Sequence, residues 1–437
     1  MTRTILLALL ASCVPSTSEL RAPVDHDLVA RLGAAPAPDV DALLAHPLDA
    51  EAAIRIALAQ SPRLAAQLDA LGIAGSELAT ALAPGAMHVD LQLRFAGSSH
   101  EYEVDAIQPV LNLITGARRR AAARADLAAA RARATATALR LAARVEIAFH
   151  DLVAAQQELE LRHTAFDAAD AAATLRERMH AAGNTSDLAL ARDRDAREQA
   201  RIDVGRAEAA VETRRERLNA LLGLSGQRTK WLAAGTLPAA PAAAPALDDL
   251  EPAAVTASLD LAADRARVDA ASNRAGDERV RALVPDLGVG VSAIDHDDSW
   301  MVGPALRFGL PVFDQNQGPR ARANAELARA GDELAAAAIE LRAEARAARI
   351  TALAAYEEAR HLHDVVLPLR QQIVDETLLH YNAMDADPFQ LIVARRELVD
   401  AHHQYLDALR RYANALSEVA ALRRGVSLAE EPHDDHP

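Results

Sequence analysis

The sequence of 437 residues predicts a mainly α-helical protein with a small β part, built from two copies of one unit. The first observation is an internal repeat. Pro109, Val110, Leu111, Gly116, Arg118 and Arg120 return with the same spacing as Pro311, Val312, Phe313, Gly318, Arg320 and Arg322. The second is that each copy passes from alternating apolar residues, typical of strands, to a seven-residue period, typical of antiparallel coiled-coil helices. A repeat far longer than the about 20 to 50 residues of solenoids indicates two copies of a large unit.

The N-terminus reads as a secretory signal peptide over residues 1–12. Arg3 is followed by a short apolar run that ends at Ala11, too short to span a bilayer as a helix. Leu10-Ala11-Ser12-Cys13 resembles a bacterial lipobox, so we expect Cys13 to be lipidated and to carry palmitate. The alternative is an ordinary signal peptide with an incidental cysteine. Cys13 is the only cysteine, which excludes an internal disulfide, and Val14, in place of the Asp that marks inner-membrane retention, favours the outer membrane.

Composition and charge exclude several classes of protein. The net charge of −15 argues against nucleic-acid binding. No later segment has the run of about 18 apolar residues that a transmembrane helix needs, so any further bilayer contact must use strands or the lipid anchor. Aromatic residues make up only 3% of the chain, which suits long, closely packed helices better than a large globular core.

The chain divides into segments that follow the repeat. Residues 13–48 contain several prolines and little periodicity, and we predict that they are a lipidated, extended segment. Repeat 1 covers residues 49–235, and an Ala/Pro-rich, semi-rigid linker covers 236–248. Repeat 2 covers residues 249–426 and is followed by an acidic tail, 427–437.

Residues 88–107 predict the first β-hairpin. Apolar Val89, Leu91, Leu93 and Phe95 alternate with His88, Asp90, Gln92 and Arg94, which gives one apolar and one polar face. Residues 97–100 are the expected turn, and Tyr102 and Val104 then alternate with Glu103 and Asp105.

Residues 286–309 predict the second hairpin, with Asp295 to Asp298 as its turn. Strands of this length suit a tilted transmembrane β-strand. The alternative is a soluble hairpin packed on helices.

Each hairpin precedes two long helices. We predict helices over residues 117–181 and 186–222 in the first copy, and over 319–381 and 388–424 in the second, with Ser186 and Asp387 as N-caps. A helix of residues 117–181 would be about 95 Å long. In the last helix two rows repeat every seven residues, which indicates a coiled-coil seam: Leu391, Leu398, Tyr405, Tyr412 and Val419, and Ala394, Ala401, Ala408, Ala415 and Leu422.

Four strands cannot close a barrel, and open sheet edges cannot face lipid. If the strands cross a membrane, several chains must therefore associate. Three chains would supply a 12-stranded barrel, an even number in the usual range.

Several segments resemble the TolC-type outer-membrane efflux proteins, over roughly residues 49–425. Residues 57–64, Ala-Leu-Ala-Gln-Ser-Pro-Arg-Leu, resemble the opening helix of that family, with Ser61 in place of the usual Asn. Residues 182–188 resemble the family's first helical turn. Residues 310–318, Leu-Pro-Val-Phe-Asp-Gln-Asn-Gln-Gly, are similar to the metal-efflux (CzcC- and CusC-like) branch, although organic compounds and type I secretion stay open as alternatives.

The resemblance implies a homotrimer with a β-barrel in the outer membrane and a periplasmic helical tunnel. It also implies a periplasmic adaptor (membrane fusion protein) and an energised inner-membrane pump of the RND type as partners. Such a protein is a passive conduit of a tripartite efflux system, here for heavy-metal cations, and is neither an enzyme nor a protein that needs a cofactor.

The resemblance also implies site residues. Asp385, Asp387 and Asp187 lie at the helical turns where the family closes its channel, and each would form a ring of three carboxylates in a trimer, of the kind that selects cations. The alternative, compatible with the first, is that these aspartates cap helices. Gly183, Asn184 and Ser186 would contact the adaptor, and Asp90, Arg94, Glu103 and Asp105 would line the barrel lumen.

The fifteen histidines do not predict a metal site. His402 and His403 are adjacent on one helix and point in different directions, and His361 and His363 do not share a helical face. His433 and His436 lie in the acidic tail and suggest at most weak binding of a divalent ion. The alternative is that the tail is solvated and binds no metal.

Two other classes of function stay open. A periplasmic, lipid-anchored coiled-coil scaffold or adaptor without a pore would explain the helices but not the two amphipathic hairpins. A periplasmic metal-binding enzyme would need a ligand cluster, and no catalytic motif stands out.

Overall fold

The computed structural model describes residues 16–33, 39–83, 85–96, 99–284, 286–296, 299–309, 315–385 and 387–429. The signal peptide, Cys13, most of residues 310–318 and the end of the acidic tail therefore lie outside the described residues. The chain forms two compact units. Unit 1 contains Met1–Asp27, Ala65–Ala136 and Leu259–Glu340, and unit 2 contains Leu28–Leu64, Thr137–Ser258 and Leu341–Pro437.

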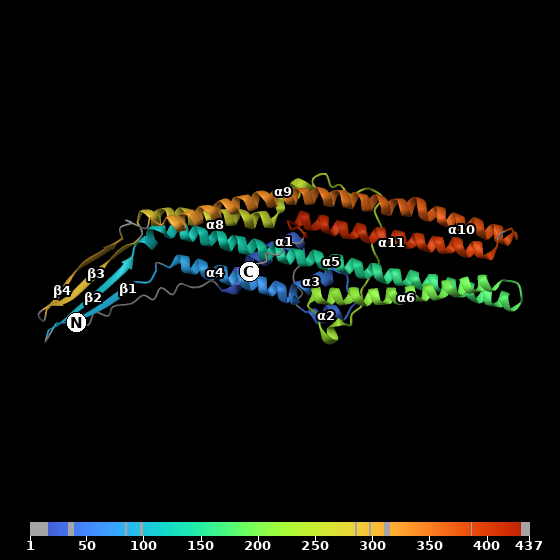
Figure 1. The fold of residues 1–437 in the computed structure, drawn as a ribbon, viewed down its shortest axis with the longest axis horizontal. Helices are drawn as coiled ribbons and strands as arrows, with labels where there is room; N and C mark the ends of the chain where they lie inside the picture. The colour runs from blue at the N-terminus through green and yellow to red at the C-terminus, as the bar shows by residue number, and fades with distance from the viewer. Residues whose placement is uncertain are drawn as a thin grey trace. The chain divides into compact units, whose positions relative to one another are not determined.

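Unit 1 contains one antiparallel sheet with strand order β1-β2-β3-β4 (Figure 1). Its strands are β1 (His88–Ala96), β2 (Ser99–Pro109), β3 (Leu287–His296) and β4 (Ser299–Phe308). Both predicted hairpins form, and β2 pairs with β3 to join the two repeats, with Asp105 opposite Ser292. Consequently β1 and β4 are the two edges of the sheet.

Unit 1 also contains residues of five helices: α1 (Thr17–Leu32), α4 (Pro62–Leu82), α5 (Leu111–Ala181), α8 (Leu259–Leu283) and α9 (Gln317–His361). Leu20, Val24, Leu71, Ala74, Leu127 and Ala134 form a buried apolar cluster among α1, α4 and α5. Gly75 allows this approach, because a Cβ there would lie 2.5 Å from Leu20 Cδ1.

The prediction of an extended segment over residues 13–48 is wrong for most of its described part. Residues 17–32 form α1 and Val40–Leu44 form α2. The prolines of this segment concealed a helical pattern. Leu20, Val24 and Leu28 lie four residues apart on one helical face, and all three are buried. Burial of this row outweighs the cost of Pro23 inside the helix.

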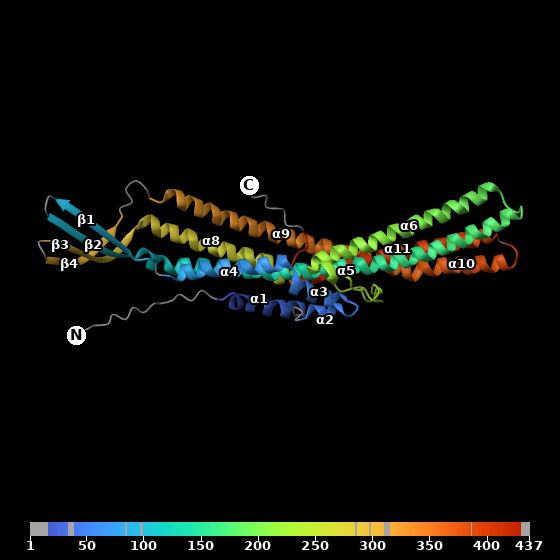
Figure 2. The same cartoon turned by 90° about the horizontal axis from the view of Figure 1, so that it is seen from below.

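Unit 2 contains two long helical hairpins, visible as paired ribbons in Figure 1 and Figure 2. The first joins α5 to α6 (Asp187–Leu222), and the second joins α10 (Leu367–Asn382) to α11 (Pro388–Arg424). Unit 2 also contains α2, the short helices α3 (Ala50–Gln60) and α7 (Leu250–Ala257), the 3₁₀ turn η1 (Gly226–Thr229) and the last part of α9. In α11 the predicted row of small residues is buried, which confirms the seam: Ala394, Ala401, Ala408 and Ala415.

The predicted helix over residues 319–381 is interrupted. A π-helical segment, η2 (Leu362–Val366), separates α9 from α10. It ends two residues before Pro368, which has no backbone N–H and cannot complete a regular α-helical ladder.

The last helix of each repeat ends at a glycine in the same way. Gly223 (φ 71°) and Gly425 (φ 96°) end α6 and α11 in the left-handed conformation. A Cβ would lie 2.7 Å from the carbonyl oxygen of Gln60 at Gly223, and 2.1 Å from that of Ala257 at Gly425. Each copy therefore packs the end of its last helix on the end of its first, and only glycine fits there.

The linker at residues 236–248 packs on the helices of unit 2. Leu237 and Leu247 are buried. The backbone N–H of Leu237 donates to Gln157 Oε1 (3.1 Å), and Tyr356 Oη donates to the carbonyl of Ala242 (3.1 Å). The linker is thus part of the packed structure as well as a connection between repeats.

No helix in the described ranges carries an apolar stretch long enough to cross a bilayer.

Candidate functional site: a two-faced sheet and two helical turns

The sheet of unit 1 has an apolar face that is exposed in the single chain. The strand register places Leu91, Val104, Ala293 and Val302 side by side in one row of this face. The face also exposes larger side chains: Val89, Leu93, Phe95, Val291, Trp300, Leu306 and Phe308. A continuous apolar surface of this kind is covered by lipid or by a partner in functional proteins.

The opposite face of the sheet is polar and carries ion pairs. Arg94 lies 2.8 Å from Glu103 and 3.7 Å from Glu101, and Arg307 lies 3.3 Å from Asp90. Asp105 lies directly opposite Asp90 in the β1–β2 register. The four residues predicted for a barrel lumen, Asp90, Arg94, Glu103 and Asp105, therefore lie together on this face.

The two helical hairpins of unit 2 end in the same turn geometry. In the first turn the backbone N–H of Asn184 donates to the carbonyl of Met179, and that of Gly183 to His180 (both 2.8 Å). In the second turn the backbone N–H of Asp385 donates to the carbonyl of His380 (2.9 Å), and that of Met384 donates to the carbonyl of Tyr381 (3.0 Å). Both are Schellman motifs, which use a left-handed residue after the helix.

The left-handed residue of the second turn is not a glycine. Gly183 has φ 76° and Met384 has φ 62°. A methionine in this region is strained, and its side chain is 96% exposed. The sequence contained no signal for this feature, because the turn was expected only from the break in periodicity.

The three aspartates predicted for the gate all lie at these turns. Asp187 Oδ1 is 2.6 Å from His180 Nε2, and Asp385 Oδ2 is 3.0 Å from His380 Nδ1. Asp387 caps α11, because its carboxylate accepts a hydrogen bond from the N–H of Phe389 (2.9 Å). The capping alternative is thus confirmed for Asp387. Ser186 caps α6 as predicted, by accepting from Ala189 N–H (3.3 Å).

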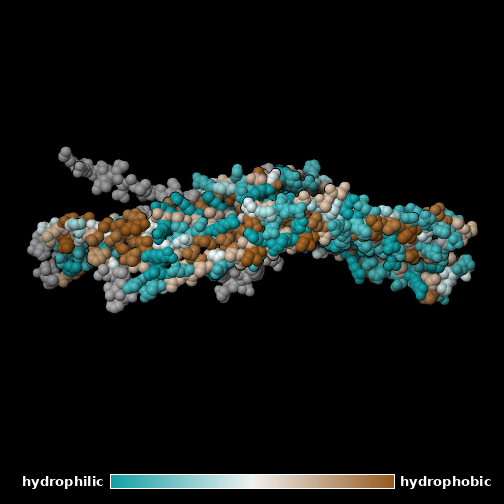
Figure 3. Space-filling view, turned by 90° about the horizontal axis from the view of Figure 1, so that it is seen from above, coloured by the Kyte–Doolittle hydropathy of each residue, from teal (hydrophilic) through white to brown (hydrophobic). Residues whose placement is uncertain are grey.

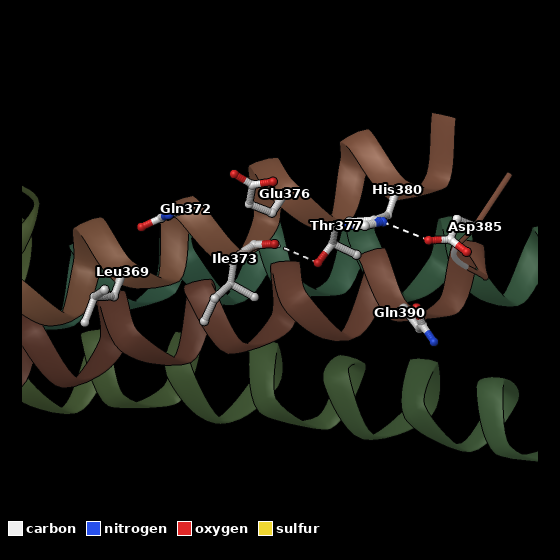
Figure 4. Close-up of a pocket in the computed structure, with 8 residues that line it drawn as sticks. All are labelled: Leu369, Gln372, Ile373, Glu376, Thr377, His380, Asp385 and Gln390. Atoms are coloured by element: carbon white, nitrogen blue, oxygen red, sulfur yellow. Dashed lines mark hydrogen bonds and ion pairs between the residues drawn. The ribbon is translucent and has the colours of Figure 1, made fainter. Parts of the chain in front are cut away.

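A surface groove lies beside the second turn, with a volume of about 610 Å³ (Figure 4). Leu369, Ile373 and Thr377, spaced by four on α10, form its wall, and His380 and Asp385 close one end. Figure 4 shows His380 and Asp385 joined by their hydrogen bond, next to Gln390 of α11.

One arginine connects the two hairpins close to their turns. Arg176 Nε of α5 donates to Asp193 Oδ2 of α6 (2.5 Å), and its Nη1 donates to Thr185 Oγ1 in the turn (3.2 Å). The guanidinium also lies over the ring of Phe389 in α11, 3.0 Å from the centroid. With only 13% of its side chain exposed, Arg176 forms a well-shielded cation–π contact. We call these contacts the Arg176 tie, and the sequence did not predict them.

A second connection between α5 and α11 lies further from the turns. His403 Nδ1 is 2.6 Å from Glu158 Oε2, and Arg162 Nε donates to the other oxygen of the same carboxylate (2.7 Å). Burial raises the pKa of Glu158, but the hydrogen bonds and positive charges of His403 and Arg162 together outweigh burial and hold this pKa below its ordinary value.

The described ranges contain no group of three or more His, Cys, Asp or Glu side chains arranged to hold a metal ion. His402 is exposed and contacts the carbonyl of Leu398 on its own helix (2.9 Å), whereas His403 faces α5, so the two point in different directions as predicted.

Comparison with known proteins gives the fold its class. No protein-family model matches the sequence, and no curated protein is similar to it. Solved structures do match. CusC, whose structure concerns folding and transmembrane channel formation, matches with TM-score 0.70 and 16% identity over 85% of this chain and 91% of CusC. The outer-membrane protein VceC of Vibrio cholerae matches with TM-score 0.70 and 15% identity over 95% of this chain and 100% of VceC.

A third match, the outer-membrane channel OprN, has TM-score 0.68 and 18% identity over 86% of this chain and 90% of OprN. The chain therefore has the fold of TolC-type outer-membrane channel proteins, with long helical hairpins and a four-stranded sheet in each protomer. The resemblance found in the sequence is confirmed at the level of the fold.

Proposed function

We propose that this chain is the protomer of a homotrimeric outer-membrane channel in a tripartite efflux system. The observation that carries the proposal is the sheet, which is apolar and exposed on one face, carries ion pairs on the other, and ends in two unpaired edges. Backbone groups at such edges cannot face lipid. Three copies satisfy them by pairing β4 of one chain with β1 of the next, antiparallel, into a 12-stranded barrel.

Cysteine cross-linking tests this assembly. A cysteine at Gln92 of β1 is combined with cysteines along β4, at Met301, Gly303 or Ala305, and oxidised in membranes. Covalent trimers from at least one pair are expected. The matched control pair, Asp105→Cys with Ser292→Cys, lies in the internal β2–β3 register and should cross-link only within a chain. Failure of every β1–β4 pair to link chains, while the control pair closes, contradicts the barrel.

The polar face of the sheet would then line the lumen, and the helical turns would form the gate. Rings of three carboxylates at Asp385, Asp387 and Asp187 would favour cations. The test is Asp385→Asn with Asp387→Asn, because asparagine keeps the helix cap and removes the charge. The cation-over-anion permeability ratio should fall in planar bilayers, and an unchanged ratio removes these residues from the pore.

The turn residues Gly183, Asn184 and Ser186 are exposed and suit contact with a periplasmic adaptor. An inner-membrane pump of the RND type would supply the energy, so that this chain conducts passively and is not an enzyme. A photo-cross-linking residue at Asn184 should capture an adaptor identifiable by mass spectrometry. The same residue at Thr213, an exposed position of α6, is the control.

Heavy-metal cations are the proposed substrates. Support comes from the similarity of residues 310–318 to the metal-efflux branch. Deletion of the gene should sensitise cells to metal salts more than to organic compounds, and the reverse pattern would contradict this assignment.

Anchoring through Cys13 is the last part of the proposal. Incorporation of labelled palmitate should occur in the natural chain and disappear in Cys13→Ala. Labelling that persists in the variant would place the lipid elsewhere.

A further inference from the structure

Exposed apolar residues surround the strands of unit 1 where the strands meet the helices. Leu82 and Met87 lie between α4 and β1, and Leu113 and Ile114 lie in the first turn of α5, directly after β2. Leu283 ends α8 just before β3 and is 77% exposed. We call these five residues the junction residues. They add exposed apolar surface at the ends of the helices, next to the strands in the chain.

Arginines follow the junction residues in the next turns of the helices. The first fourteen residues of α5, Leu111 to Arg124, contain four arginines and no Asp or Glu. The start of α9 repeats the pattern with Arg320 and Arg322. Neither helix has an acidic residue in its first turn. The macrodipole favours acidic side chains at this end of a helix, so helix stability does not explain the arginines.

Some of these arginines have partners within the chain. Arg118 donates to the carbonyl of Gly276, and Arg322 pairs with Glu326 (2.7 Å). Three others differ, because no carboxylate of the described residues pairs with Arg120, Arg124 or Arg320. We call these three the arginine collar. Arg124 and Arg320 are exposed, and Arg120 is half-buried.

The geometry directs the collar toward the strands. Side chains of an α-helix lean toward its N-terminus; α5 begins at Leu111, directly after β2, and α9 is the first helix after β4. Leu113, Arg120 and Arg124 are seven and four residues apart, so they share one face of α5. Arg120 is about 10 Å beyond Leu113 along the axis, and its long side chain reaches back over part of that distance.

An apolar belt followed by cations matches the profile of a bilayer. A membrane passes from hydrocarbon to charged headgroups within roughly 5 to 8 Å on each side. On the face drawn in Figure 3, hydrophobic residues form a dense patch near the end that carries the strands, and beyond this patch hydrophilic and hydrophobic residues are mixed. A guanidinium binds phosphate oxygens with two parallel hydrogen bonds.

We propose that the arginine collar binds the phosphate groups of anionic phospholipids in the membrane leaflet on the helix side of the sheet. The inference rests on the proposed function, since it requires the strands to cross a membrane. It adds a lipid partner and the residues that recognise it.

The test uses the full chain purified in detergent from membranes, with bound lipid counted by native mass spectrometry. The trimer is mixed with equal concentrations of anionic dioleoyl phosphatidylglycerol and zwitterionic dioleoyl phosphatidylcholine. The test variant is R120Q/R124Q/R320Q. The control, R192Q/R217Q/R395Q, removes three exposed arginines from α6 and α11.

The natural chain and the control should retain phosphatidylglycerol in preference to phosphatidylcholine. In the test variant this preference should fall at least tenfold, because each arginine near an anionic surface contributes about fivefold. High salt should weaken the preference of the natural chain. Equal retention by the natural chain and the test variant overturns the proposal. Displacement of the lipid by equimolar glycerol 3-phosphate also overturns it, since it would reveal a site for free anions.

Two further measurements keep the outcomes separate. If the triple variant does not assemble, the single variant Arg124→Gln, at an exposed position, should still lose about fivefold in preference. Trimer size and conductance are measured on the same samples. A conducting trimer without lipid preference contradicts only the collar, whereas a preparation that neither trimerises nor conducts contradicts the proposed function.

Discussion

The substitution Leu91→Arg distinguishes a sheet that spans a membrane from a sheet that faces water. Leu91 is near the middle of β1, opposite Val104, and is 62% exposed in the single chain. If this face contacts lipid, an arginine near the bilayer midplane costs about 2 to 4 kcal/mol per chain. If the face contacts water, an exposed substitution changes stability by only about 0.5 kcal/mol.

The neighbouring residue is a matched control. Gln92 lies on the polar face, opposite Glu103, so an arginine there gains an acidic neighbour. Gln92→Arg should therefore change stability by no more than about 0.5 kcal/mol in either case. The two variants add the same side chain one residue apart, on opposite faces of one strand.

The assay is urea unfolding of the protein reconstituted in phospholipid vesicles. Unfolding is monitored by the loss of the heat-labile trimer band. A loss of about 2 to 4 kcal/mol lowers the folded-to-unfolded ratio roughly 30-fold to 900-fold, which shifts the urea midpoint strongly for Leu91→Arg and little for Gln92→Arg. Equal midpoints for the two variants would refute a lipid-facing sheet.

Three further predictions concern the helices of unit 2. Arg176→Gln removes the Arg176 tie and should raise the open probability of the channel. Arg178→Gln, at an exposed position two residues away, should not raise it. Equal open probabilities in the two variants would exclude the tie from gating. The pKa of Glu158 is lower in the folded chain than in the unfolded chain, so its ionised carboxylate stabilises the fold above the ordinary pKa of about 4.3, and this stabilisation is lost as pH falls further. The natural chain should therefore lose stability toward pH 3 more steeply than Glu158→Gln. Parallel curves of stability against pH from circular dichroism would contradict this. Gly425→Ala should destabilise the fold by at least about 2 kcal/mol, because of its positive φ and the nearby Ala257 carbonyl, whereas Gly331→Ala, in open space within α9, should be neutral or stabilising in thermal melts; equal melting temperatures for the two variants would disprove the packing argument.

Much of the fold follows from periodicity in the sequence. Alternation at residues 88–95 predicts β1 with its correct faces, since side-chain direction in a strand depends only on position. The seven-residue spacing predicts α11 and its buried row of alanines. The polar residues Asp90, Arg94, Glu103 and Asp105 lie together for the same reason, because neighbouring strands of a hairpin keep their polar faces on one side.

What the sequence did not predict depends on packing between distant segments. The pairing of β2 with β3 joins two repeats, and no local pattern specifies it. The Arg176 tie requires two helical hairpins to pack before Arg176 meets Phe389, although Phe389 is one of only six phenylalanines in the chain. α1 was missed because the prolines scattered over residues 13–48 obscured a row of apolar residues with helical spacing, and the strain at Met384 is visible only in the backbone.

The most direct test of the account is the single-channel conductance of the protein purified from membranes, with its oligomer size measured in parallel. Discrete, cation-selective openings from a trimer are the predicted result. A water-soluble, non-conducting monomer or dimer, obtained once the lipid anchor is removed, would contradict the conduit and leave the two hairpins as strands of a soluble scaffold.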